Sequence, residues 1–308
     1  FVELKLYIHI IYMVKTCKMK GGVRLASGYA DRKQALAFFL MNSTFSVLTN
    51  NSISCITLVV SLVPGVPSPY RVLRARNFND HVDKILLKIF ITSPKDSWFE
   101  IVGRGGYNGI EITSKEVFHN EINIQRDIYR KSFLSKVSLL EPMCPHILNY
   151  HHCGQNGSTV QTFASLNGLN PNEQADLNKI LQGGSIHNNQ ISFIAMEFMA
   201  GYQIASDILT TYRDNGQKEK INFFLNMIQY EFQRLNMYKY KHGDAHFGNV
   251  MIHPDYDYLD GGPKGRVIII DFGRTIKDDN INTSIVDNNL ERFRNEPWGI
   301  NPSHLIDI

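Results

Sequence analysis

Cysteine is scarce in this 308-residue sequence, which contains only Cys17, Cys55, Cys144 and Cys153. No two of them form a Cys-x-x-Cys pair, and no group of histidines and cysteines has the spacing of a zinc site. A disulfide-rich secreted fold or a structural zinc domain would need such a pattern. We therefore expect free thiols in a reducing, intracellular compartment.

Long hydrophobic runs are also missing. The apolar stretch at residues 6–14 is short, whereas a helix needs about 20 apolar residues to cross a bilayer. Lys15, Lys18 and Lys20 follow it, where a secretory signal would have a cleavage site of small residues. The sequence thus predicts no membrane span and a cytoplasmic location.

Neither sign of charge dominates the composition. The 32 basic and 29 acidic residues leave a formal net charge of +3, which gives no reason to expect nucleic acid or an anionic membrane as a partner. The hydrophobic share of 43% and the charged share of 20% are typical of a globular protein. The length suits one domain with two lobes.

The order of the expected elements indicates an α+β fold. Apolar and alternating runs predict a hairpin and then four strands, at residues 45–63, 84–92, 147–153, 191–199 and 266–270. Helical spacing of apolar residues and helix-start signals predict three helices, at residues 31–41, 114–132 and 220–238. A first half rich in strands and a more helical second half are typical of the α+β class.

Composition divides the chain into three parts. We expect an N-terminal extension at residues 1–40, a first lobe at 41–199 and a second lobe at 200–308. Residues 154–190 are rich in Asn, Gly, Ser and Gln, a composition typical of loops. We interpret them as a polar loop or insertion within the first lobe.

The segment with the most chemical information, at residues 241–274, is KHGDAHFGNVMIHPDYDYLDGGPKGRVIIIDFGR. Asp244 and Asn249 share a short loop, and Asp271 follows a predicted strand that forms a hairpin with the strand after Asn249. Phosphoryl transfer needs a triphosphate's charge neutralised and an attacking hydroxyl held in line. Because Mg²⁺ prefers oxygen ligands, Asn249 and Asp271 are candidate metal ligands. Asp244 is left to orient the hydroxyl or to accept its proton.

This segment, with HxDxxxxN followed by DFG, resembles the protein-kinase-like superfamily. The resemblance implies a two-lobed fold, with an antiparallel sheet in the first lobe and a reduced helical second lobe, and it implies ATP and Mg²⁺ as cofactors. Lys88 then matches the lysine that holds the α- and β-phosphates, and Glu121 matches the glutamate that pairs with it. Glu197 and Met199 lie in the segment MEFM, which looks like the hinge whose backbone binds adenine.

Four features depart from the usual protein-kinase pattern. Gly243 replaces the common arginine, and His246 stands where many of these kinases have lysine. The first hairpin has no glycine in its turn at residues 49–52, and the glycine-rich run at 103–109 follows Lys88, so we interpret that run as an ordinary loop. No APE motif follows the DFG.

The pattern HGDxHxxN is also similar to the aminoglycoside and choline kinase families, and to compact kinase-like proteins of large DNA viruses. A viral protein of this kind would act in the host cytoplasm or be carried in the virion.

Three functions remain open from the sequence. The first is a phosphotransferase that uses ATP and Mg²⁺, with a protein Ser/Thr hydroxyl as preferred acceptor, a small-molecule hydroxyl as alternative, and His246 steadying the γ-phosphate. The second is a pseudokinase that acts as a binding or scaffold module. The third is a metal hydrolase built on His242, Asp244 and His246, which would leave Asn249 and the DFG strand without a role.

Overall fold

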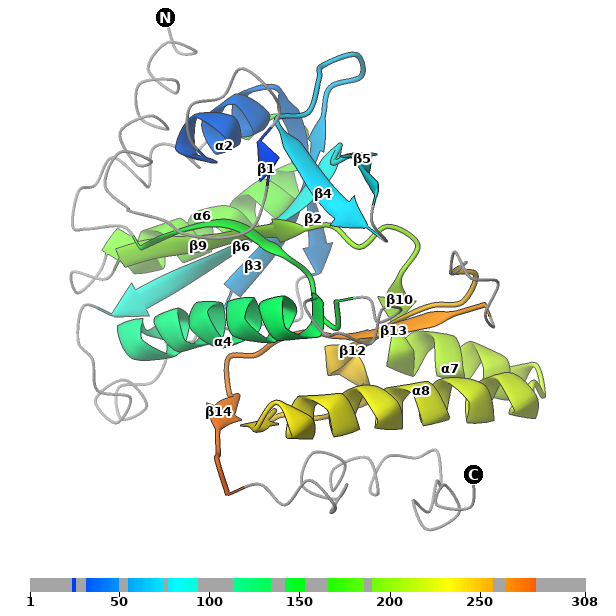
Figure 1. Cartoon of the computed structure of the whole chain (residues 1–308). Helices are drawn as coiled ribbons and strands as arrows, with labels where there is room; N and C mark the ends of the chain where they lie inside the picture. Colours follow the sequence, from blue (N-terminus) through cyan, green and yellow to red (C-terminus); the bar gives the residue numbers. More distant parts are fainter. Residues whose placement is uncertain are drawn as a thin grey trace, which may run out of the picture. The chain divides into compact units, whose positions relative to one another are not determined.

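The computed structural model describes residues 24–25, 32–49, 55–74, 77–93, 113–133, 142–152, 166–185, 190–256 and 264–280. These residues form a mixed fold of helices and antiparallel sheets, as the element order predicts (Figure 1). The chain divides into two compact units. The first consists of residues 1–122 and 146–198, and the second of residues 123–145 and 199–308.

The main sheet of the first unit has the order β2-β3-β6-β9-β8, with every neighbour in this path antiparallel. These strands are β2 (Ser43–Thr49), β3 (Cys55–Leu62), β6 (Lys84–Ser93), β9 (Gln190–Glu197) and β8 (Ile147–His152). The short strand β7 (Thr113–Ser114) adds to β6 in parallel. The hairpin and the three further first-half strands expected from the sequence are therefore confirmed, with boundaries shifted by a residue or two.

Alternation along β6 sorts its side chains onto two faces. Ile85, Leu87 and Ile89 are buried in one cluster, together with α2 (Arg32–Met41) and Leu177. Phe90 belongs to a second cluster, with residues from the first half of α4 (Lys115–Phe133). Because side chains alternate along a strand, Lys88 lies on the same face as Phe90, the face that α4 covers.

A small sheet completes the strands of the first unit. Its order is β1-β4-β5, from β1 (Arg24–Leu25), β4 (Tyr70–Arg74) and β5 (Asn77–His81), and both pairings are antiparallel. Tyr70 is fully buried, and its ring lies against that of Phe39 on α2. The helix α2 is thus part of the core of this unit, and the boundary expected at residue 40 falls inside it.

The helix α6 (Pro171–Ser185) corrects one interpretation of the sequence, because it lies within the range that we expected to be a polar loop. Asn170 accepts hydrogen bonds from the backbone N–H groups of Asn172 and Glu173, each at 3.0 Å, and so caps the helix. Pro171 occupies the first helical position, which proline favours. Leu177 is fully buried in the core cluster of the first unit, so this mostly polar helix is tied to that core.

The second unit is built around α8 (Lys218–Met237), the clearest helix in the sequence, whose prediction is confirmed. Its neighbours are α7 (Ala205–Asp214), the sheet β10-β12-β13, and the pair β11-β14. The strands are β10 (Gln203–Ile204), β12 (Val250–His253), β13 (Arg266–Ile269), β11 (Tyr240–Lys241) and β14 (Ile276–Lys277). The sequence analysis identified β13 but not α7.

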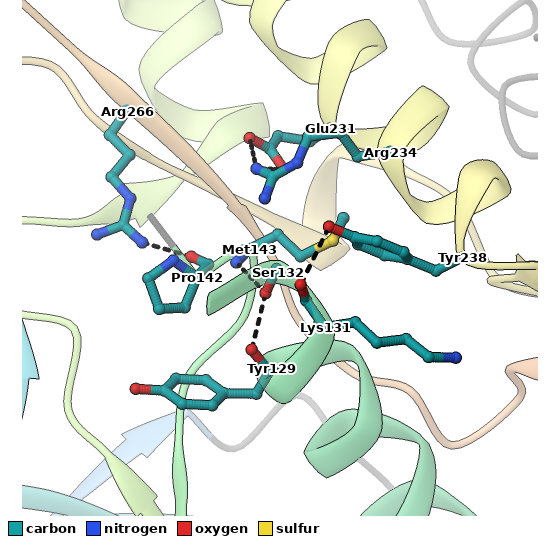
Figure 2. A network of polar contacts seen from close by, with 9 residues as sticks. All are labelled: Tyr129, Lys131, Ser132, Pro142, Met143, Glu231, Arg234, Tyr238 and Arg266. Carbon is teal, nitrogen blue, oxygen red and sulfur yellow. Dashed lines mark hydrogen bonds and ion pairs between the residues drawn. The ribbon is translucent and has the colours of Figure 1, made fainter. Parts of the chain in front are cut away.

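A network of polar contacts holds the second half of α4 and the segment after it to α8 and β13 (Figure 2). Arg234 on α8 contacts both carboxylate oxygens of Glu231 at 2.8 Å, and Tyr238 donates to the carbonyl of Lys131 at 3.4 Å. Arg266 donates to the carbonyl of Pro142. The hydrogen bonds to Lys131 and Pro142, with Ile124 and Met143 in the core of the second unit, agree with the placement of residues 123–145 in that unit, although we expected them in the first lobe.

No helix among the described residues has the length and apolar character needed to cross a membrane.

Candidate functional site

Lys88 and Glu121 form an ion pair within the first unit. The Lys88 ammonium lies 2.9 Å from the Glu121 carboxylate, and the two side chains are 15% and 3% exposed. Glu121 reaches the sheet because it follows Phe118 by three residues and precedes Ile122, both of which pack on the same face. The Lys88 ammonium also lies 5.0 Å from the ring centre of Phe90. The sequence analysis expected this pair from the resemblance, and a lysine on a buried strand needs such a partner.

In the second unit, the loop from His242 to Asn249 presents the Asp244 side chain. Asp244 is 22% exposed, so its carboxylate is reachable from solvent. The loop ends in the short 3₁₀ helix η2 (Phe247–Asn249), which His246 caps by accepting a hydrogen bond at Nδ1 from the N–H of Gly248. That bond makes Nδ1 an acceptor. The other ring nitrogen of His246, Nε2, therefore bears the proton and lies 3.8 Å from Asp244 Oδ2.

Asn249 connects this loop to the strand that carries Asp271. Its Nδ2 donates to the backbone carbonyl of Asp244 at 2.9 Å, and its own carbonyl accepts from the N–H of Ile270 at 2.9 Å. The strands β12 and β13 pair with Val250 opposite Ile269. Asp271 is therefore the residue directly after Ile270, whose N–H is bonded to Asn249. Because the amide nitrogen of Asn249 is engaged with the loop, its oxygen is the atom left to meet a cation.

Asp271 begins a tightly held segment. Its φ angle of +60° is unusual for a residue other than glycine, and its side chain is exposed. Two residues further the chain turns, with the N–H of Thr275 bonded to the carbonyl of Phe272 at 3.0 Å. The Thr275 hydroxyl donates to the carbonyl of His242 at 3.0 Å. The DFG segment and the loop before Asp244 are thus joined by direct contacts.

Gly243 makes the closest of these approaches. Its φ is +77°, and a Cβ atom placed on it would lie 2.2 Å from the carbonyl oxygen of Arg274. No side chain fits there unless that carbonyl shifts, which gives a physical reason for glycine at this position. Arg274 instead places its guanidinium near the carboxylate, with Nη1 3.6 Å from Asp244 Oδ1.

His242 packs beneath the loop. Its side chain is fully buried between the rings of Phe232 and Phe272, and Nε2 lies 3.0 Å from the carbonyl oxygen of Ile270. Burial lowers the pKa of this imidazole, against the hydrogen bond to Ile270 and the nearby charges of Asp244 and Asp271, which raise it. His242 therefore supports the loop by packing and hydrogen bonding.

The expected hinge residues lie where the two units meet in sequence. Glu197 ends β9 in the first unit and is buried, and its N–H donates to the carbonyl of His146 at 2.9 Å. Met199 begins a segment of the second unit, and its carbonyl accepts from the N–H of Tyr202 at 3.2 Å. Whether their backbone binds adenine stays a prediction.

The donor atoms present suit a magnesium ion that is only partly held by protein. Among the described residues, no group of three or more His, Cys, Asp and Glu side chains could hold a metal. Mg²⁺ in nucleotide enzymes commonly takes one or two protein oxygens and completes its shell with phosphate and water. Asn249 and Asp271 supply hard oxygen donors of that kind, so the residues fit the group.

The structure therefore brings together two sets of the expected residues. In the first unit Lys88 pairs with Glu121. In the second unit Asp244, His246 and Asn249 are in mutual contact. Asp271 directly follows Ile270, whose N–H is bonded to the carbonyl of Asn249. The hairpin turn after Thr49 and the glycine-rich run at 103–109 lie outside the described residues. Sequence reasoning missed Arg274, because its position beside Asp244 depends on tertiary contacts.

Comparisons with known proteins add little to this geometry. No family model matches the chain, and no curated protein matches it. A solved structure titled WaaP in complex with acyl carrier protein is similar over 87% of this chain and 78% of its own, with 12% sequence identity and a TM-score of 0.42. A similarity this loose carries no argument about activity.

Proposed function

We propose that this protein is an ATP- and magnesium-dependent phosphotransferase of the protein-kinase-like type, which transfers the γ-phosphoryl group to a hydroxyl. A protein serine or threonine is the acceptor that we test first, and a small-molecule alcohol is the alternative. The proposal rests chiefly on one observation. The Asn249 side chain is bonded to the carbonyl of Asp244 while its backbone is bonded to Ile270, the neighbour of Asp271.

These contacts divide the chemistry between two carboxylates. Asp244 would not bind the metal. Its carboxylate would accept a hydrogen bond from the acceptor hydroxyl, align that hydroxyl and take up its proton. Asn249 Oδ1 and the Asp271 carboxylate would hold the magnesium ion. When bound, the ion neutralises charge on the triphosphate. His246, with a proton on Nε2, would donate a hydrogen bond to a transferring phosphoryl oxygen.

The ion pair of the first unit supplies the remaining charge. Lys88 is 15% exposed, so its ammonium can meet a phosphate without leaving Glu121. Since an ammonium held in one place by a carboxylate loses less freedom on binding, Glu121 would act as the group that positions Lys88. Glu197 and Met199 would contribute backbone contacts to the adenine.

The test is transfer of label from γ-labelled ATP, with generic basic proteins, small alcohols and aminoglycosides as acceptors. We expect Asp271→Asn and Asp244→Asn each to reduce transfer by roughly 10²–10⁴-fold, because each removes a charge used in the reaction. Asp214→Asn, which removes a carboxylate that is 61% exposed on α7, is the matched control and should leave transfer unchanged.

Lys88 needs a paired variant, because Lys88→Met alone would leave the buried Glu121 carboxylate without its ion-pair partner and destabilise the first unit. The double variant Lys88→Met with Glu121→Gln buries no such charge. We expect it to regain stability but not transfer.

If the wild-type protein gains thermal stability from Mg-ATP yet transfers no label, the scaffold function replaces the proposed one. Absence of both would refute nucleotide binding altogether.

A further inference from the structure

Arg274 is a cationic side chain built into the candidate site without a part in the function proposed so far. Its guanidinium lies 3.6 Å from Asp244 Oδ1, on the carboxylate that would receive the acceptor hydroxyl. On the other oxygen of the same carboxylate, His246 Nε2 lies 3.8 Å away. Asp244 is therefore flanked by two nitrogen donors, one at each oxygen.

The backbone fixes the position of Arg274. The carbonyl of Arg274 occupies the space where a Cβ of residue 243 would be, and Thr275 is bonded to the carbonyl of His242 at 3.0 Å. One residue further, β14 pairs with β11, with Ile276 opposite Lys241. These contacts fix the backbone of Arg274 beside Asp244, so its guanidinium stays within reach of the acceptor side.

Arg274 also retains the capacity to bind something else. Its side chain is 61% exposed, and 3.6 Å is longer than a charge-assisted hydrogen bond, which is about 2.7–2.9 Å. A guanidinium has five N–H donors arranged for planar anions such as carboxylate and phosphate. The Asp244 contact at this distance satisfies few of them.

We propose that Arg274 is a specificity-determining residue which binds an anionic group on the acceptor, a carboxylate or a phosphate close to the hydroxyl that is phosphorylated. The inference rests on the proposed function and names its substrate class. An acceptor whose hydroxyl bonds to Asp244 brings its neighbouring substituents alongside Arg274. An anion there gains a charge-assisted contact, whereas a neutral group leaves the guanidinium with Asp244 alone.

The experiment compares acceptors in matched pairs that differ only in the anion. One arm uses serine peptides with glutamate or glutamine at each position around the serine. The other uses small alcohols with and without a phosphate, such as glucose and glucose 6-phosphate. For each pair we measure the ratio of kcat/KM for the anionic member to that for the neutral one. The arm in which the ratio is high identifies the source of the anion.

In the wild-type protein we expect a ratio of roughly 10–100 for at least one pair, the range that one hydrogen bond between charged groups provides. Arg274→Gln should bring that ratio close to one, and Arg274→Lys should retain part of it. Lys277→Gln removes the same charge from a side chain that is 55% exposed and paired with Asp279, so it should leave the ratio high. Thermal unfolding of every variant checks that it is folded.

The outcomes separate this inference from the function on which it rests. Transfer that requires Asp271 but shows no preference for anions, or a preference that Arg274→Gln retains, overturns the role of Arg274 and leaves the phosphotransferase intact. An equal loss of preference in Lys277→Gln would attribute the effect to general electrostatics and overturn it as well. Absence of transfer to every acceptor overturns both proposals.

Discussion

Gly243 shows how one residue can set the geometry next to a candidate catalytic group. Its positive φ and its contact with the carbonyl of Arg274 are separate demands, and only glycine meets both. The motif HGD could be recognised in the sequence, but the reason for its glycine could not, because the contact depends on a segment far along the chain. Arg274 was overlooked for the same reason.

A comparison of two glycine positions separates these demands. Gly216, between α7 and α8, has a φ of +67° and no atom within 4 Å of the place that a Cβ would take, so only backbone strain opposes alanine there. We expect Gly216→Ala to lower the free energy of unfolding by about 1 kcal/mol. Gly243→Ala should cost at least about 2 kcal/mol more, because the methyl group must displace the Arg274 carbonyl. Urea unfolding measures both, and equal losses would contradict the close contact.

At the scale of elements, α8 combines a regular apolar face with a buried ion pair. Phe224, Ile228 and Phe232 are buried at helical spacing and made the helix predictable. Glu231 and Arg234, which are 9% and 4% exposed, could not be distinguished in the sequence from a solvated pair. Burial raises the pKa of the Glu231 carboxyl, and the charge of Arg234 opposes that rise.

Removal of one partner of this pair should be more damaging than removal of both. Arg234→Met leaves the Glu231 carboxylate buried without its main partner, and we expect a loss of about 3–5 kcal/mol in the free energy of unfolding. The double variant with Glu231→Leu removes the carboxylate that the single variant leaves without its main partner, so at least half of that loss should return. A double variant no more stable than the single one would show that Arg234 acts mainly through its other contacts. Urea unfolding of the wild type, both singles and the double gives the coupling.

The helix α6 marks the limit of element prediction from composition. Its sequence PNEQADLNKILQGGS is mostly polar and includes two glycines, so periodicity gave no clear signal. The cap at Asn170 and the proline after it were present in the sequence, but such caps also occur in turns. The burial of Leu177 in the core of the first unit is a tertiary contact that these local signals do not contain.

For the molecule as a whole, pH provides a test through His242. The folded protein binds a proton at this imidazole more weakly than the unfolded chain does, because burial lowers its pKa. The unfolded chain therefore takes up more protons as the pH falls below about 6.5, and the folded state loses stability. This contribution is fully present above that pH and declines by at most about 1.4 kcal/mol per pH unit below it.

His242→Gln removes the titration while its amide can still donate to the carbonyl of Ile270. We expect the variant to lose less stability than the wild type between pH 7 and pH 5, in chemical unfolding at a series of pH values. The difference between the two curves isolates His242 from the other ten of the eleven histidines. Parallel curves would mean that His242 already binds protons as readily in the folded state as in the unfolded one.

The large-scale organisation could be predicted only in outline. The α+β class, the main strands and the long helices follow from local patterns, and Lys88 stood out as a charge within an apolar run. The assignment of residues 123–145 to the second unit did not follow, because it depends on contacts such as that between Ile269 and Met143, 2.8 Å between N and O. The apolar pattern of α4 predicts which residues are buried, but not in which of the two cores each half of the helix is buried.

The way the chain alternates between the units limits how it can be cut. It leaves the first unit after Ile122, returns at His146 and leaves again after Phe198. A protein shortened to end at residue 198 would keep Ile124, Ile128 and Met143 while losing the partners that bury them. A fragment expressed as residues 1–198 would therefore expose an apolar surface that favours aggregation. To express the first unit alone in soluble form, residues 123–145 would have to be replaced by a short linker.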